Sequence, residues 1–159
     1  KKGTASKSAS PPKVLKLDFI SSPSLKKLLS AKYSAGAVNA AMLIARLALG
    51  ILMMDHGYDK LIHFSEYSHQ FINFLGMGKT LSLALVVFAE FFCSLFLILG
   101  LFTRLATIPL IITMCVVIFS INNGKVFMQH ESPALYLTGF LVLLIIGPGR
   151  ISVDSMIGK

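Results

Sequence analysis

Long apolar runs separated by short polar stretches dominate most of this chain. Four runs are long enough, or nearly so, to cross a bilayer: residues 38–54, 80–101, 105–119 and 134–146. The first, third and fourth are shorter than about 20 residues, so their ends must extend into flanking residues or the membrane must be thin there. The pattern predicts an all-α integral membrane protein, a four-helix antiparallel bundle.

Two local patterns refine this fold. The tripeptide 102–104 joins the second and third runs and predicts a helical hairpin. Between the first and second runs, over residues 58–79, apolar residues recur at roughly helical spacing among polar ones. This spacing predicts an amphipathic helix at the outer membrane interface, ended by Gly76 and Gly78. These apolar residues are Leu61, Phe64, Phe71, Ile72 and Leu75.

The composition supports a membrane protein. Of 159 residues, 55% are hydrophobic and only 14% are charged, whereas globular proteins have roughly 25% charged residues. The mean hydropathy is +0.76. A water-soluble domain of this size could not cover so much apolar surface. The composition also excludes a disordered chain, a disulfide scaffold and, despite a pI of about 9.7, an ordinary nucleic-acid-binding domain.

The positive charge is concentrated at the start of the chain. Residues 1–37 contain eight lysines and one acid, which gives this segment nearly all of the net charge of +8. We predict a basic cytoplasmic tail over residues 1–37, followed by the membrane domain over residues 38–159. A helix beginning near Ser22 could lie on an anionic leaflet, or the tail could be a solvated segment that only sets the topology.

The lysines and arginines of the loops predict the orientation. The tail, Arg104, Arg150 and Lys159 fall on one side of the predicted bundle, and Lys60, Lys79 and Lys125 on the other. Because positive residues accumulate on the cytoplasmic side, we predict that both termini are cytoplasmic.

Two charged residues fall inside the apolar runs. Arg46 lies near the middle of the first run and Glu90 near the middle of the second. Counted from the predicted outer ends of their runs, both are at similar depth, about 12 and 15 Å at about 1.5 Å per residue. We therefore predict an Arg46–Glu90 ion pair or a shared polar cavity. Such a centre could bind a ligand or move a proton, or it could simply fix helix register.

A further polar group follows the first run. If the helix continues past Gly57, then His56, Lys60 and His63 share one face. Together with Asp59 they lack a recognised metal-ligand pattern, so we predict no metal site. We expect instead an interfacial cluster that lines a head-group pocket. Alternatively, Lys60 has no role in the cluster and simply extends its ammonium group to the membrane surface.

Several short motifs follow one another over about residues 38–155: Ala45-Arg46-Leu47-Ala48-Leu49-Gly50, His56-Gly57, Lys60, Glu90, Leu99-Gly100-Leu101-Phe102-Thr103-Arg104 and Gly147-Pro148-Gly149-Arg150-Ile151-Ser152-Val153-Asp154. In their residues and their order they resemble the DoxX family. The resemblance implies a small bacterial inner-membrane protein with four helices. It assigns the recurring polar positions to Arg46, His56, Lys60, Glu90 and Arg104, and the closing motif to Gly147, Pro148, Gly149 and Asp154. Within that motif we expect Pro148 and its glycines to end the fourth span, and Ser152 or Asp154 to cap a short helix.

DoxX-like proteins are associated with quinone-linked oxidation and with oxidoreductase complexes that counter thiol and oxidative stress. The resemblance thus implies a redox-associated subunit with no intrinsic cofactor beyond a possible quinone. Arg46, Glu90 and His56 are its catalytic candidates, and these residues with Lys60 are its ligand-binding candidates. Since the sequence shows neither a haem ligand pair nor iron–sulfur cysteines, either a partner oxidoreductase would carry the electrons or the protein would only bind the quinone.

Two alternatives remain open. The bundle could be a non-catalytic anchor or scaffold for a partner protein, or a small proton-coupled transporter. Small residues at Ala37, Ala41, Ala45 and Ala48 form a stripe that would let another helix pack closely, which is compatible with a homo-oligomer.

Overall fold

The computed structural model describes residues 33–121 and 131–158, and within these ranges its regular elements are all helices, without a strand. The proposed surface helix of the basic tail lies outside the described residues. The elements are α2 (Ala35–Ile62), α3 (Phe64–Gln70), η1 (Phe74–Gly76), α4 (Lys79–Val87), η2 (Phe88–Cys93), α5 (Ser94–Leu99), α6 (Thr103–Val116), η3 (Val117–Ile121), α7 (Glu131–Ile146) and α8 (Val153–Ile157).

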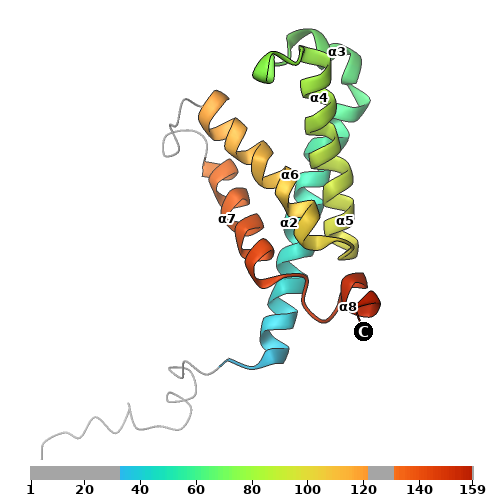
Figure 1. Ribbon diagram of the computed structural model, residues 1–159, viewed down its shortest axis with the longest axis vertical. Coiled ribbons are helices and arrows are strands. Elements are labelled where there is room, and N and C mark those ends of the chain that lie inside the picture. The colour runs from blue at the N-terminus through green and yellow to red at the C-terminus, as the bar shows by residue number, and fades with distance from the viewer. Residues whose placement is uncertain (1–32, 122–130, 159) are drawn as a thin grey trace, which may run out of the picture. The chain divides into compact units, whose positions relative to one another are not determined.

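Three helices of the described chain are long and apolar enough to cross a membrane. They cover residues Ala35–Ile62, Lys79–Leu99 and Thr103–Ser120. The second of these, here called the second long helix, runs through α4, η2 and α5 without interruption. A fourth apolar helix, Ser132–Ile146 within α7, is shorter and packs against α6 and α2 (Figure 1). The apolar pattern thus located each long helix of the described ranges, although α2 continues well past the predicted end at Met54.

The connection between α2 and α4 differs from a single amphipathic helix. The short helix α3 follows α2 directly, and η1 is a single turn in which Leu75 has a φ of 52°. The predicted termination at Gly76 and Gly78 is wrong, because the helix α3 already ends at Gln70. Gly78 has a φ of 94° and is the N-cap of α4. The Asn73 side chain accepts a hydrogen bond from the Gly78 N–H at 2.7 Å, which fixes this turn.

Glycines set the register between α2 and its neighbours. A Cβ at Gly57 would lie 2.5 Å from the Phe91 nitrogen, and one at Gly50 would lie 2.6 Å from the Ile98 side chain. A Cβ at Gly139 of α7 would lie 2.6 Å from the Leu49 side chain. Close approach through small residues is the usual way in which membrane helices pack. The second long helix runs antiparallel to α2, because Gly50 meets Ile98 whereas Gly57 meets the earlier residue Phe91. Helix α7 also runs antiparallel to α2, because Leu49 meets Gly139 whereas His56 meets Tyr136.

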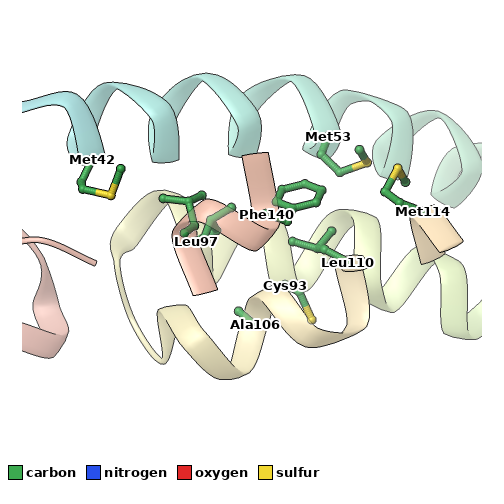
Figure 2. Packing of buried hydrophobic residues seen from close by; sticks show 9 residues of the cluster. Met42, Met53, Cys93, Leu97, Ala106, Leu110, Met114 and Phe140 are labelled. Carbon is green, nitrogen blue, oxygen red and sulfur yellow. The ribbon is translucent and has the colours of Figure 1, made fainter. Parts of the chain in front are cut away.

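Apolar side chains fill the space between these helices (Figure 2). Leu97, Leu110, Phe140 and Leu143 are completely buried. In Figure 2, Leu97, Met53 and Phe140 lie between α2 and the helices opposite it. The whole cluster comprises Met42, Met53, Cys93, Leu97, Ala106, Leu110, Met114, Phe140 and Leu143.

Candidate functional site

An ion pair joins α2 to the second long helix. The Lys60 Nζ lies 2.6 Å from the Glu90 Oε2, and it also approaches the His56 carbonyl oxygen at 3.5 Å. The Glu90 side chain is only 5% exposed, whereas that of Lys60 is 26% exposed. Lys60 therefore turns inward to the carboxylate instead of snorkelling away from it. The pair presents its cationic partner toward the surface and keeps its anionic partner inside.

Local backbone geometry brings these two residues together. Glu90 lies in η2, where the helix takes π-helical geometry, a form that is common at functional sites. Gly57 lies directly against the backbone of Glu90 and Phe91. Lys60 follows Gly57 by about one turn and therefore projects toward Glu90. The absence of a side chain at position 57 makes the ion pair geometrically possible.

His56 and a residue that sequence reasoning missed complete this group. The rings of His56 and Tyr136 meet edge to face, with centroids 6.3 Å apart. Tyr136 belongs to α7 and stacks on Phe140 at 6.1 Å. The only available signal was that Tyr136 is the single tyrosine of the fourth apolar run. We call His56, Lys60, Glu90 and Tyr136 the Lys60–Glu90 cluster.

Arg46 lies in a second, separate group. Its side chain is buried, with 2% of the residue exposed, and it donates hydrogen bonds to the Pro148 and Ile151 carbonyl oxygens at 2.9 and 2.8 Å. The glycines on either side of Pro148 have φ values of 94° and 77°, so this turn requires glycine. As predicted, the Gly-Pro-Gly turn ends the fourth apolar helix, at Ile146. It also directs backbone carbonyls at the Arg46 guanidinium.

The predicted ion pair between Arg46 and Glu90 is wrong. Arg46 lies level with Gly100, where a Cβ would collide with its guanidinium, whereas Glu90 lies level with Gly57. Eleven residues of α2 separate these levels, about 16 Å at about 1.5 Å per residue. The depth estimate failed because α2 does not end at Met54 but continues to Ile62. Gly57 permits close packing and does not break the helix.

Asp154 stabilises the turn between the second and third long helices. Its two carboxylate oxygens accept hydrogen bonds from the Phe102 and Thr103 N–H groups at 2.6 and 2.9 Å. Partial burial by itself would raise the pKa of Asp154, but these hydrogen bonds and the nearby Arg46 charge hold that pKa below its ordinary value. The predicted cap of the short helix α8 is Ser152, whose side chain accepts from the Ser155 N–H. Asp154 caps the start of α6 instead.

The remaining predicted polar residues lie at the surface. His63 ends α2 and pairs with Asp59 at 3.1 Å, and Tyr67 donates to the other Asp59 oxygen at 3.0 Å. This group is separate from the His56–Tyr136 contact. Arg104 is exposed at the start of α6 and donates to the Ile145 carbonyl oxygen at 3.4 Å. Over residues 33–121 and 131–158, no group of histidine, cysteine and acidic residues could hold a metal ion.

Two apolar cavities lie between the second long helix and α6. One of about 290 Å³ is lined by residues that include Leu85, Phe88 and Ile112, and another of about 310 Å³ includes Phe88 and Phe96. Pro109 borders both. Neither lining includes a residue of the Lys60–Glu90 cluster, so the cavities and the charged group occupy different parts of the protein.

Comparison with known proteins agrees with the sequence motifs. A family model described as DoxX matches residues 41–123, which is more than half of the chain. No curated protein and no solved structure matches the chain. The matched segment contains Arg46, His56, Lys60 and Glu90, whereas Tyr136 and Asp154 lie beyond it.

Proposed function

This chain belongs to the DoxX family, and we propose that it acts as a membrane subunit or accessory of a quinone-linked or redox-stress oxidoreductase system. The observation that carries the proposal is the Lys60–Glu90 pair, with its carboxylate buried inside an apolar helix. Ionisable groups inside membrane helices are expensive to bury, and they commonly mark ligand sites or proton relays.

The donor set suits a quinone head group. Glu90 uses Oε2 for Lys60, and no hydrogen bond joins its Oε1 to a described residue. The Lys60 ammonium has three N–H donors, and the His56 ring can donate or accept a proton. Lys60 and His56 would hold the carbonyl oxygens of the head group, and Glu90 would hold or release a proton at Oε1. A bound quinone supplies two-electron redox chemistry, with electrons exchanged through a partner oxidoreductase.

Quinone content of the purified protein tests this function. Mass spectrometry of detergent-purified parent protein is expected to find about one quinone per chain, with strong depletion in Glu90→Gln. The matched control Glu66→Gln changes an exposed glutamate of α3 and is expected to retain the parent's content. Quinone no more abundant than in bulk lipid, in parent and variants alike, would reject the quinone role.

A scaffold is the second candidate, and one feature of α2 favours it. Ala37, Ala41 and Ala48 of the small-residue stripe are exposed, so the described bundle leaves this stripe largely uncovered. Such a surface suits close packing of another membrane helix, from a partner or from a second copy. A stable complex that survives Glu90→Gln, in a protein without bound quinone, would favour the scaffold.

We further propose four membrane crossings, with α7 as the fourth, in a bacterial inner membrane. The start of α2 and the segment after α7 meet, because the Asn39 side chain accepts a hydrogen bond from the Arg150 N–H at 3.0 Å. This contact supports placing both ends of the membrane domain on one side, and the basic tail favours the cytoplasmic side. The cluster would then face the outer compartment, with α3 at the outer interface.

A further inference from the structure

Within residues 33–121 and 131–158, the buried charges occupy two levels with an apolar layer between them. The Lys60–Glu90 pair marks one level, beside Gly57. Arg46 and the carbonyl oxygens of Pro148 and Ile151 mark the other, beside Gly100. The levels are about 16 Å apart along α2.

Three helices supply the apolar layer. Met53 of α2, Leu97 of α5, and Phe140 and Leu143 of α7 are at most 1% exposed. On each helix these residues lie between the positions that mark the two levels, and Figure 2 shows Met53, Leu97 and Phe140 packed in one group. The Oγ of the buried Ser94 has no hydrogen-bond partner among the described residues. A buried water needs two to four polar partners, so this single hydroxyl is not enough to hold a water in the layer.

Arg46 adds an electrostatic barrier beyond this layer. Its guanidinium carries a fixed positive charge, since arginine is not deprotonated in proteins. A fixed positive charge in a narrow path excludes protons and other cations. By contrast, the route from Glu90 toward the other end passes Lys60, whose charge is neutralised by its pairing with Glu90 and whose side chain is 26% exposed near the end of α2. It also passes His56, which is exposed.

We propose that Glu90 exchanges protons with only one compartment, the one at the Lys60 end of the bundle. The Met53–Leu97–Phe140–Leu143 layer and the Arg46 charge seal the opposite direction. The protein then offers an acid–base group to one face of the membrane and does not conduct protons across it. This inference rests on the Lys60–Glu90 cluster and on the layer, and it is independent of any redox role.

Cysteine accessibility tests the direction of access. With Cys93 and Cys115 replaced by alanine, single cysteines are introduced at Glu90, at Glu66 in α3 and at Met156 in α8. Each variant is reconstituted in oriented liposomes, and a charged, membrane-impermeant thiol reagent is added to one side at a time. We expect Glu90→Cys to react from the side that modifies Glu66→Cys, at least ten times faster than from the side that modifies Met156→Cys. Equal reaction from both sides, reaction mainly from the Met156 side, or no reaction while both markers react, would overturn the proposal.

A second measurement, on protein that retains Glu90, follows proton leak into liposomes under an imposed pH gradient. The parent protein is expected to leak no more than protein-free liposomes. Leu97→Asn places a polar side chain in the layer and is expected to raise the leak at least ten-fold, with Glu90→Gln in the same chain abolishing the increase. Leu99→Asn, at a half-exposed position of the same helix, is the matched control and should not raise the leak. A parent leak that Glu90→Gln removes, or a leak in Leu97→Asn no greater than in Leu99→Asn, would overturn the proposal. Quinone extraction does not depend on either result, so this proposal and the redox proposal can fail separately.

Discussion

Gly57 and Phe91 meet backbone to backbone, so closely that a Cβ at position 57 would lie 2.5 Å from the Phe91 nitrogen. This contact fixes α2 against the π-helical turn that contains Glu90. It also determines where Lys60 points. A residue without a side chain therefore controls the geometry of the charged cluster.

We expect Gly57→Ala to push α2 away from η2 and to destabilise the protein. Overpacking at a tight contact costs about 1–3 kcal/mol. Thermal unfolding in detergent measures the loss. Gly36→Ala is the control, because the only described atom that its Cβ would meet is the Ser34 Oγ, at 4.0 Å, and alanine favours the helix. Equal stability of Gly57→Ala and Gly36→Ala would contradict the close contact.

The Lys60–Glu90 pair is expected to show strong coupling in a double-mutant cycle. Lys60→Met leaves a buried carboxylate without its cation and should cost more than the double variant Lys60→Met/Glu90→Gln, in which no charge is stranded. Because Lys60 is partly exposed, we expect a coupling energy of about 1–2 kcal/mol. Additive effects in chemical unfolding would show that the two charges do not interact.

Arg46→Lys is expected to loosen the segment after α7. A lysine ammonium cannot reproduce the fork that binds the Pro148 and Ile151 carbonyl oxygens together. Amide hydrogen exchange over residues 147–157 should become at least ten-fold faster, since a hydrogen bond to a charged group contributes about 1.5–3 kcal/mol. Arg104→Lys, which changes an exposed arginine with a single long hydrogen bond, should leave exchange there nearly unchanged. Similar exchange in both variants would refute the proposed role of Arg46.

The Asp154 carboxylate is expected to contribute to the free energy of unfolding at neutral pH and to lose this contribution in acid. Because its folded-state pKa lies below its ordinary value, the stabilisation is present above the unfolded-state pKa of about 3.9 and is lost as pH falls through the folded pKa. At pH 7 we expect the free energy of unfolding of the parent to exceed that of Asp154→Asn by about 0.5–1 kcal/mol, because the carboxylate is only partly buried. Unfolding measured from pH 7 to pH 3 should show this difference shrinking toward the acid end. If the difference in unfolding free energy between the parent and Asp154→Asn does not change with pH, the carboxylate charge does not cause it.

The long helices were predictable because apolar length is a direct requirement of the bilayer. The candidate residues Arg46 and Glu90 were likewise identifiable, since a charge within an apolar run stands out. Their partners were not predictable, because pairing depends on helix register. The register here follows from contacts at Gly57 and Gly50, and a glycine in a sequence is equally compatible with a helix end. Because the sequence does not reveal that register, Lys60 was predicted to lie at the membrane interface and not beside Glu90.

Two other residues show a different limit. Asp154 was predicted as a possible cap of its own short helix, but it caps α6, which begins far earlier in the chain. Tyr136 looked like an ordinary member of an apolar run, and only the approach of α7 to His56 distinguishes it. Both roles arise from contacts between distant segments, about which local patterns carry no information.

The acceptors of Arg46 impose an order on biosynthesis. The guanidinium and the two carbonyl oxygens that it binds are separated by 102 and 105 positions in the chain. During synthesis, α2 therefore enters the membrane long before its arginine can obtain these acceptors. Arg46 obtains these two hydrogen bonds only when the segment after α7 has been made and folded back. A chain that stopped before Pro148 would retain a buried charge without these two acceptors, so a quality-control protease could distinguish unfinished copies from complete ones.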